Sequence, residues 1–290
     1  MSALLGRALS YGRMIKFSHS VFALPFALTS LVLAAGRDLR PRTVLWILVA
    51  MVGGRSAAMG FNRLADQWID ARNPRTAGRE LPRGLLSRAE VWGFVVLSAA
   101  AMIVAAGMLN PLCLALSPVA LAVVFGYSYT KRFTPLSHLV LGLALAIAPV
   151  GAWLAVRGTF DREPIVLGLA VLCWVAGFDA IYACQDAEFD RQEGLRSLPA
   201  WLGIGRALAL AKLLHALAVV LLASLYAMTA LHPIYLVGVL GVAALLAYEH
   251  SLVRAEDLSR VDLAFFTLNG WISVGYFVIT AAARWLQPAL

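Results

Sequence analysis

Residues 91–129 read VWGFVVLSAAAMIVAAGMLNPLCLALSPVALAVVFGYSY, and this stretch contains no aspartate, glutamate, lysine or arginine. About 20 apolar residues are enough for a helix to cross a bilayer, so the stretch is long enough for two crossings. Asn110-Pro111 divides it near its middle, and such a pair is typical of a turn. The stretch therefore predicts two transmembrane helices joined by a short turn.

The same pattern extends along the chain, in which 61% of the residues are hydrophobic and 14% are charged. Soluble proteins have about 25% charged residues, so the composition predicts an all-α, polytopic membrane protein. A bundle of this length can bury a large site, and we expect one domain over residues 1–290. Nine transmembrane helices are predicted, at residues 19–36, 43–65, 89–108, 111–129, 137–156, 164–184, 206–228, 233–252 and 262–286.

The positions of the basic residues predict the orientation of the chain. The net charge of +8 could indicate nucleic-acid binding. The basic residues, however, lie in short loops between apolar runs, which is the pattern of the positive-inside rule. We therefore exclude a nucleic-acid-binding protein. The richer set of loops and ends holds Arg7, Arg13, Lys16, Arg72, Arg75, Arg79, Arg83, Arg88, Lys131, Arg132, Arg191, Arg196, Arg206, Arg254 and Arg260. The poorer set holds Arg37, Arg40, Arg42, Arg157, Arg162 and Arg284. We therefore expect an inner-membrane protein with its N-terminus in the cytoplasm.

A first acidic stretch follows the second predicted span. Asn62, Asp66 and Asp70 are spaced four residues apart, so on a helix they lie along one face. Two carboxylates one turn apart repel each other, and desolvation at a membrane boundary adds to the cost. Carboxylate and amide oxygens suit Mg²⁺, which usually takes one or two carboxylates together with substrate phosphates. The pattern therefore predicts a Mg²⁺ site facing the cytoplasm.

The loop after this stretch is rich in arginine, with Arg72, Arg75 and Arg79 in eight residues. The guanidinium group is planar and pairs with two oxygens at once, which suits a diphosphate. A positive-inside loop beside a solvated helix end is the alternative.

A second acidic stretch follows the sixth predicted span. Asp186 and Asp190 are again four residues apart, and on a continuous helix Asp179 lies on the same face about two turns deeper. An ionisable residue at that depth is a functional candidate, although Asp179 could also be a polar residue satisfied inside the bundle. Two matching pairs on one side of the membrane predict Mg²⁺ ions that hold one diphosphate from both sides.

Other polar residues in the spans are candidates for substrate binding. Arg55 lies seven residues before Asn62, on the same face and deeper in the membrane, where it needs an anion such as a substrate carboxylate. Pairing with Asp179 or with backbone carbonyls is the alternative. Tyr127 and Lys131 are four residues apart and could both reach a phosphate, or could be an aromatic belt with a flanking lysine. His19 is interpreted as interfacial, and the other histidines receive no role.

Together these residues resemble the UbiA-type intramembrane prenyltransferases over about residues 15 to 285. The first signature of that family is matched by Asn62-x-x-x-Asp66-x-x-x-Asp70 with Arg75-Thr76-x-x-Arg79-x-Leu-Pro82-x-Gly84. The second is matched by Asp186-x-x-x-Asp190 after Asp179. Tyr127-x-x-x-Lys131 is similar to the family's Tyr/Lys pair, and Arg55 falls where aromatic-acid members place an arginine.

The resemblance implies nine helices around a central cavity open to lipid, and Mg²⁺-dependent transfer of a polyprenyl group from its diphosphate to an aromatic acceptor. Metal would be held by Asn62, Asp66, Asp70, Asp186 and Asp190. Glu80 stands where many hydroxybenzoate members have proline, which resembles a subgroup linked to the futalosine route to menaquinone. The acceptor is therefore 4-hydroxybenzoate or 1,4-dihydroxy-6-naphthoate, in ubiquinone or menaquinone biosynthesis. No obligate protein partner is inferred.

Other classes of function fit the sequence less well. A secondary transporter could use the carboxylates as coupling-ion sites, but transporters usually place such sites near the midplane on broken helices. A lipid-diphosphate phosphatase would need an activated nucleophile, and the sequence shows no candidate. Haem-directed farnesylation is an outlying alternative, since Arg55 suits an acid acceptor better.

Overall fold

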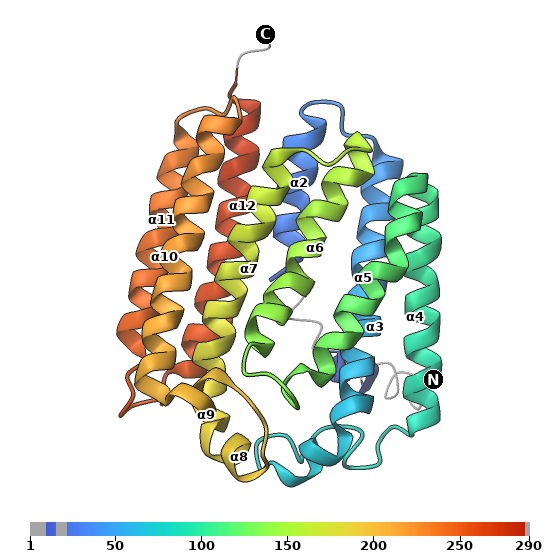
Figure 1. The fold of residues 1–290 in the computed structure, drawn as a ribbon. Coiled ribbons are helices and arrows are strands. Elements are labelled where there is room, and N and C mark those ends of the chain that lie inside the picture. Colours follow the sequence, from blue (N-terminus) through green and yellow to red (C-terminus); the bar gives the residue numbers. More distant parts are fainter. Residues whose placement is uncertain (1–9, 16–21, 288–290) are drawn as a thin grey trace. The chain divides into compact units, whose positions relative to one another are not determined.

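A computed structural model describes residues 10–15 and 22–287. Arg7, Lys16 and His19 lie outside these residues. The elements, in chain order, are α2 (Leu24–Ala35), α3 (Pro41–Arg72), α4 (Arg88–Leu109), α5 (Pro111–Thr130), α6 (Ser137–Arg157), α7 (Arg162–Ala183), the 3₁₀ turn η2 (Cys184–Asp186), α8 (Ala187–Gln192), α9 (Leu198–Leu202), α10 (Ile204–Met228), α11 (Ile234–Leu252), the π-helix η3 (Leu263–Leu268) and α12 (Asn269–Trp285) (Figure 1).

The described part of the chain confirms the prediction of an all-α, polytopic protein. It contains eight helices that are long and apolar enough to cross a membrane, together with the shorter apolar helix Leu24–Ala35 in the first predicted span. α3 continues past the predicted end of its span to Arg72 and carries the first acidic stretch. The count of nine spans is thus approximate, because the start of the first span is not among the described residues.

Many large apolar side chains on these helices point outward. Leu97 is 73% exposed, Leu240 is 69% exposed and Trp271 is 66% exposed. Extensive exposed apolar surface marks an interaction surface, and on helices of this length and hydropathy that surface suits lipid.

The chain divides into two compact units, which we describe separately. The first comprises residues 1–20 and 45–129, and the second comprises residues 21–44 and 130–290.

In the first unit, α3 packs closely on α4 through glycines. A Cβ on Gly53 would lie 2.8 Å from the carbonyl oxygen of Ser98, and a Cβ on Gly60 would lie 2.7 Å from Val95. Small residues allow such close approach of helices in membranes, where packing replaces the hydrophobic effect. The ring of Phe61 on α3 stacks on Phe125 of α5 with centroids 4.5 Å apart. These contacts hold α3 in place up to the residues where the acidic stretch begins.

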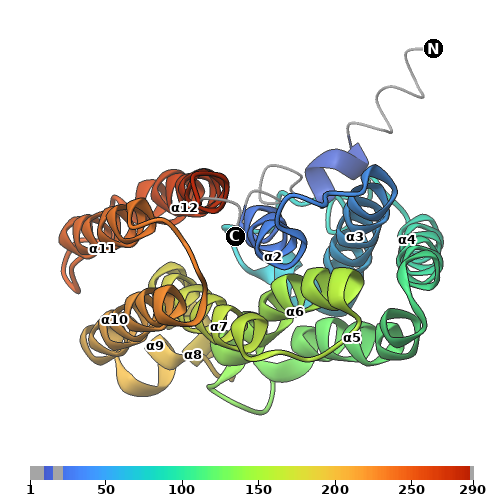
Figure 2. The ribbon, with the colours of Figure 1, turned by 90° about the horizontal axis from the view of Figure 1, so that it is seen from above.

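In the second unit, the span Arg162–Gln192, which begins with α7, is the most buried of the candidate membrane spans, with 67% of its most apolar part inside the protein. α6 and α10 lie on either side of it, and α2 packs between α6 and α12 (Figure 2). At Gly142 on α6 the backbones of the two helices meet, because a Cβ there would collide with the carbonyl oxygen of Leu172 on α7.

A polar network joins α7 to the start of α12. The indole nitrogen of Trp174 donates to the Asn269 side-chain oxygen at 2.7 Å. The amide nitrogen of Asn269 donates to the carbonyl oxygens of Ala264 and Phe265, at 3.1 and 3.2 Å. These carbonyls belong to the π-helix, whose wider turns leave backbone groups in need of partners. Asn269 thus satisfies the irregular backbone that begins the last span.

Gly142 provides a test of the α6–α7 contact. We expect Gly142→Ala to destabilise the protein by about 1–3 kcal/mol, because the added methyl group must push α6 away from the backbone of α7. Gly151→Ala on the same helix is the matched control, since nothing lies within 4 Å of its Cβ position. Thermal unfolding in detergent measures both, and equal melting temperatures would contradict the packing.

Candidate functional site

The C-terminal half of α3 carries the first acidic stretch with its carboxylates buried. Asp66 is 3% exposed and Asp70 is 4% exposed. The chain from Phe61 to Arg72 contains no proline or glycine, so the helix continues through the stretch without a break. The spacing predicted from the sequence is therefore realised on a regular helix.

Arg63 orients Asn62, and Asn62 in turn contacts Asp66. The Arg63 Nη1 atom donates to the Asn62 Oδ1 atom at 3.4 Å, and the Asn62 Nδ2 atom donates to the Asp66 Oδ2 atom at 3.1 Å. Arg63 is 4% exposed and also donates through Nε to the Met14 carbonyl oxygen at 3.3 Å. In this arrangement the Asn62 oxygen, the atom expected to face a metal, faces Arg63.

The loop after α3 turns back onto the end of the helix. The Arg79 Nη1 atom lies 2.7 and 2.8 Å from the two carboxylate oxygens of Asp70. The Thr76 hydroxyl donates to the Asp70 carbonyl oxygen at 3.1 Å, and the Asn73 carbonyl accepts the N–H groups of Thr76 and Ala77. Arg79 is thus in direct contact with the acidic stretch. A solvated loop, which was the alternative for this segment, does not explain that contact.

The other two arginines of the loop have different surroundings. Both Arg72 and Arg75 are exposed. The Arg72 guanidinium lies 4.2 Å from the centroid of the Trp68 ring. The Arg75 backbone N–H donates to the Asn73 side-chain oxygen at 2.9 Å, which holds the turn that brings Arg79 back.

Arg55 lies two turns deeper on α3, as the sequence predicted. Its Nε atom is buried and has no hydrogen-bond partner among the described residues. A buried donor without a partner costs about 1–3 kcal/mol, and more when it is charged. The site therefore contains an unsatisfied donor that a bound anion could satisfy.

The second acidic stretch does not lie on a continuous helix. α7 ends at Ala183, the 3₁₀ turn covers Cys184–Asp186, and α8 begins at Ala187. A 3₁₀ turn advances about 120° per residue where an α-helix advances about 100°, so the three residues rotate the chain beyond them by about 60°. The continuous helix that the sequence suggested is thus interrupted between Asp179 and Asp186, and the shared face of the two side chains stays a prediction.

Asp190 and Lys131 belong to one group of residues at this end of the second unit. Asp190 accepts a hydrogen bond from the Ser197 side chain and interacts electrostatically with Asp186 and Lys131. The Arg196 backbone N–H donates to the Lys131 carbonyl oxygen at 2.6 Å. This bond fastens the segment after α8 to the segment after α5, which places Lys131 near the second acidic pair.

Asp179 is paired with a histidine that the sequence did not single out. The His138 Nδ1 atom lies 2.6 Å from the Asp179 Oδ2 atom. The Leu198 backbone N–H donates to the His138 Nε2 atom at 3.3 Å, so the ring proton is on Nδ1 and is donated to the carboxylate. Asp179 is therefore satisfied inside the bundle, which is the alternative that its sequence position allowed, and is also held in one orientation.

Tyr127 and Lys131 straddle the end of α5. Tyr127 lies in the last turn of the helix, which ends at Thr130, and Lys131 is the first residue beyond it. Both side chains are half-buried. Their shared role in phosphate binding stays a prediction.

The donor set of the acidic stretches fits a hard divalent cation. Within the described residues, no group of three or more His, Cys, Asp or Glu side chains could hold a metal by itself. Mg²⁺ does not need such a cage, because it keeps several waters and takes one or two carboxylates with substrate phosphates. The pair Asp66/Asp70 and the pair Asp186/Asp190 each offer that number of carboxylates.

Comparison with known proteins gives the class of this chain. The model of the UbiA prenyltransferase family matches residues 23–271. The 4-hydroxybenzoate octaprenyltransferase of Vibrio cholerae is 32% identical over 274 residues, which cover 93% of this chain and 95% of that protein. The apo structure of a UbiA homologue from Aeropyrum pernix K1 has a TM-score of 0.79 at 34% identity, over 91% of this chain and 96% of that one.

A UbiA homologue from Archaeoglobus fulgidus, bound to GPP and Mg²⁺, has the same fold, with a TM-score of 0.77 at 22% identity over 96% of this chain and all of that one. The fold and the acidic helix ends define a multi-pass membrane prenyltransferase. The chain belongs to the UbiA prenyltransferase family.

The pair of His138 and Asp179 can be tested by a double-mutant cycle. We expect His138→Phe and Asp179→Asn each to lower the free energy of unfolding. The double variant should lose about 1–3 kcal/mol less than the sum of the two single losses, because both single variants lose the same hydrogen bond. Chemical unfolding in detergent measures the three variants. Additive effects would show that the two side chains do not interact.

Proposed function

We propose that this protein transfers a polyprenyl group from polyprenyl diphosphate to a hydroxylated aromatic acid, with Mg²⁺ as cofactor. The acceptor is 4-hydroxybenzoate or 1,4-dihydroxy-6-naphthoate, and the product is an intermediate of ubiquinone or menaquinone biosynthesis. Family membership and relatives named for prenyl transfer to 4-hydroxybenzoate support this proposal. We place the protein in the inner membrane with its acidic helix ends facing the cytoplasm, from the distribution of Lys and Arg.

The observation that carries the proposal is the buried end of α3, where Asp66 and Asp70 lie one turn apart beside Arg79. Two carboxylates that are about 96% buried and one helical turn apart are costly at a membrane boundary. A divalent cation lowers that cost and leaves coordination positions for phosphate oxygens. Arg79 already lies beside the carboxylate, so a diphosphate held there would also meet a guanidinium.

The chemistry follows from the charges that develop. The bond between the allylic carbon and the diphosphate oxygen breaks, and the electron pair leaves with the diphosphate. Asp66, Asp70, Asp186 and Asp190 would hold Mg²⁺, which would supply positive charge to stabilise this leaving group. The apolar helices exclude water from the allylic cation, which the ring carbon ortho to the hydroxyl group then attacks.

Two side chains on α3 and α7 act on the acceptor. Arg55 binds the acceptor carboxylate through the guanidinium, whose Nε atom is buried and without a partner. Asp179 orients the acceptor hydroxyl or takes the proton that the ring loses, and the His138 Nδ1–H group holds the carboxylate in place. Asn62, Arg72, Arg75, Tyr127 and Lys131 complete the binding of the diphosphate.

Glu80 bears on which acid is used. Its carboxylate lies 4.0 Å from Arg13, and its side chain is 14% exposed. Many members of the family that use 4-hydroxybenzoate have proline at this position. In this chain Glu80 instead forms an ionic contact between the loop after α3 and the N-terminal segment. The resemblance at this position supports the naphthoate, whereas the named relatives support 4-hydroxybenzoate.

We expect Asp66→Asn to lower prenyl transfer by about 100-fold or more, because the charge that holds the cation is lost. The assay uses purified protein, a polyprenyl diphosphate, either acid and Mg²⁺, with the product identified by mass. Asp38→Asn is the matched control, since Asp38 is exposed and lies outside both acidic stretches. Full activity of Asp66→Asn would refute the assignment of the first stretch.

Arg55→Leu should weaken the use of acid acceptors by about 10–100-fold, the value of a hydrogen bond to a charged group. Use of the same ring without a carboxylate should change little. Arg42→Leu, at an exposed position on the same helix, controls for the loss of an arginine. Equal losses with both kinds of acceptor would show that Arg55 does not bind the carboxylate, while the transferase assignment would stand.

A further inference from the structure

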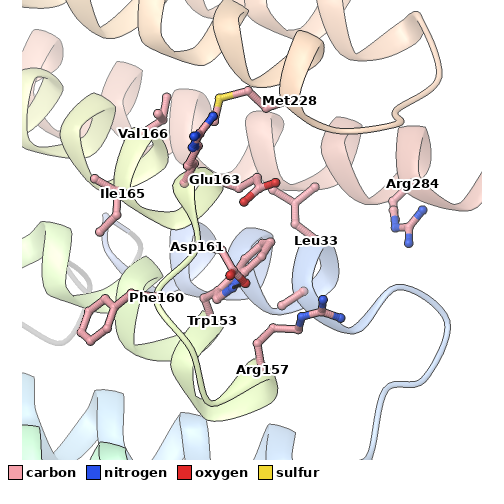
Figure 3. A pocket seen from close by; sticks show the side chains of 12 residues that line it. Leu33, Trp153, Arg157, Phe160, Asp161, Glu163, Ile165, Val166, Met228 and Arg284 are labelled. Carbon is pink, nitrogen blue, oxygen red and sulfur yellow. Dashed lines mark hydrogen bonds between the residues drawn. The ribbon is translucent and has the colours of Figure 1, made fainter.

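A separate pocket of about 930 Å³ lies in the second unit, at the end of α7 opposite to the acidic stretch. Its walls come from the last turns of α2, α6, α10 and α12 and from the first turn of α7. Figure 3 shows the side chains that line it, with Arg157 extending from α6 and Arg284 from α12. None of the residues proposed for prenyl transfer contributes to this pocket.

Three arginines line the pocket, and no described residue pairs with them. Arg157 and Arg162 are exposed, and Arg284 is half-buried. Two carboxylates, Asp161 and Glu163, also line it, yet among the described residues neither forms an ion pair with any of the three guanidinium groups. The pocket therefore has one surplus positive charge and several unused guanidinium donors.

Asp161 makes its hydrogen bonds to side chains of neighbouring residues in the sequence and not to the arginines. The Trp153 indole nitrogen donates to its Oδ2 atom at 2.7 Å, and the Thr159 hydroxyl lies 3.4 Å from both of its carboxylate oxygens. Asp161 precedes α7 at the position where an aspartate side chain usually caps the helix, but it makes no such bond. The first N–H groups of α7 are therefore not capped by this side chain.

The position of Arg162 gives the strongest reason for an anion here. Arg157 and Arg284 lie in the last turns of α6 and α12, where a cation interacts favourably with the helix dipole. Arg162 lies in the first turn of α7, where the same dipole disfavours a cation. Helix N-termini bind phosphate groups through their first N–H groups. An anion bound between Arg162 and the first N–H groups of α7 would therefore offset the unfavourable interaction of Arg162 with the dipole.

The pocket is also partly apolar and open to the surroundings. Phe160 is 57% exposed and Ile165 is 42% exposed, and both line it together with Leu33, Val166 and Met228. A small soluble anion would leave these side chains uncovered. A phosphate that carries acyl chains would cover them.

We propose that this pocket binds the head group of an anionic phospholipid such as phosphatidylglycerol. Its phosphodiester contacts Arg157, Arg162, Arg284 and the first N–H groups of α7. Its acyl chains lie along Phe160 and Ile165, and Glu163 accepts hydrogen bonds from the glycerol hydroxyls. The surplus positive charge favours an anionic head group over a zwitterionic one.

Native mass spectrometry of the full-length protein in detergent tests this proposal. Dioleoyl-phosphatidylglycerol, dioleoyl-phosphatidylcholine and dioleoyl-phosphatidylethanolamine are titrated separately, and sn-glycerol 3-phosphate serves as the soluble phosphate. We expect one phosphatidylglycerol to bind about 10-fold more tightly than either zwitterionic lipid, and glycerol phosphate to bind much more weakly. Arg157→Gln/Arg162→Gln should remove this preference without affecting folding, because both side chains are exposed.

Arg42→Gln is the matched control, since this exposed arginine does not line the pocket, and it should keep the preference. Arg284→Gln gives a second, independent variant that should weaken phosphatidylglycerol binding. Equal binding of the three lipids, or an unchanged preference in Arg157→Gln/Arg162→Gln, would overturn the proposal. Equally tight binding of glycerol phosphate would also overturn it, by showing that the site binds a soluble phosphate.

Discussion

Every charged group near the hydrocarbon core needs a partner, because no water is available there to solvate it, and this requirement shapes the functional end of the protein. Asp70 contacts Arg79 through both carboxylate oxygens, and Asp179 accepts a hydrogen bond from His138. Arg63 bonds Asn62 and the Met14 carbonyl. These bonds fix the side chains before any substrate binds, which is what a site for charge stabilisation requires.

The helices could be predicted from the sequence because lipid imposes one rule on each span. A long uncharged run between turn signals has few alternatives to a helix, so α4, α5 and α6 lie within two residues of their predicted ends. The irregular elements could not be predicted. The π-helix at Leu263–Leu268 depends on Asn269, whose amide bonds its carbonyls and whose oxygen accepts from Trp174, far away in the sequence.

The candidate site was predictable where its spacing is local and unpredictable where its partners are distant. Asn62, Asp66 and Asp70 share a helix, so a spacing of four residues was enough to align them. His138 comes 41 residues before Asp179, and its second bond is to Leu198, so nothing local indicated either contact. Arg63 follows Asn62 directly, and on an ideal helix its side chain points away from the acidic face. Its hydrogen bond to the Asn62 side chain therefore could not be predicted from the spacing.

The helix dipole gives one criterion that applies to both the acidic helix ends and the arginine-lined pocket. Asp66 and Asp70 lie near the C-terminal end of α3, where the dipole disfavours a negative charge, and Asp179 lies in the last turns of α7. Arg162 lies at the opposite end of α7, where the dipole disfavours a positive charge. A charge that opposes its own helix needs a counter-charge from elsewhere. At the end of α3 Arg79 pairs with Asp70, and the divalent cation that we propose would add to it. By the same reasoning with the opposite sign, the lipid phosphate that we propose would provide the counter-charge at Arg162.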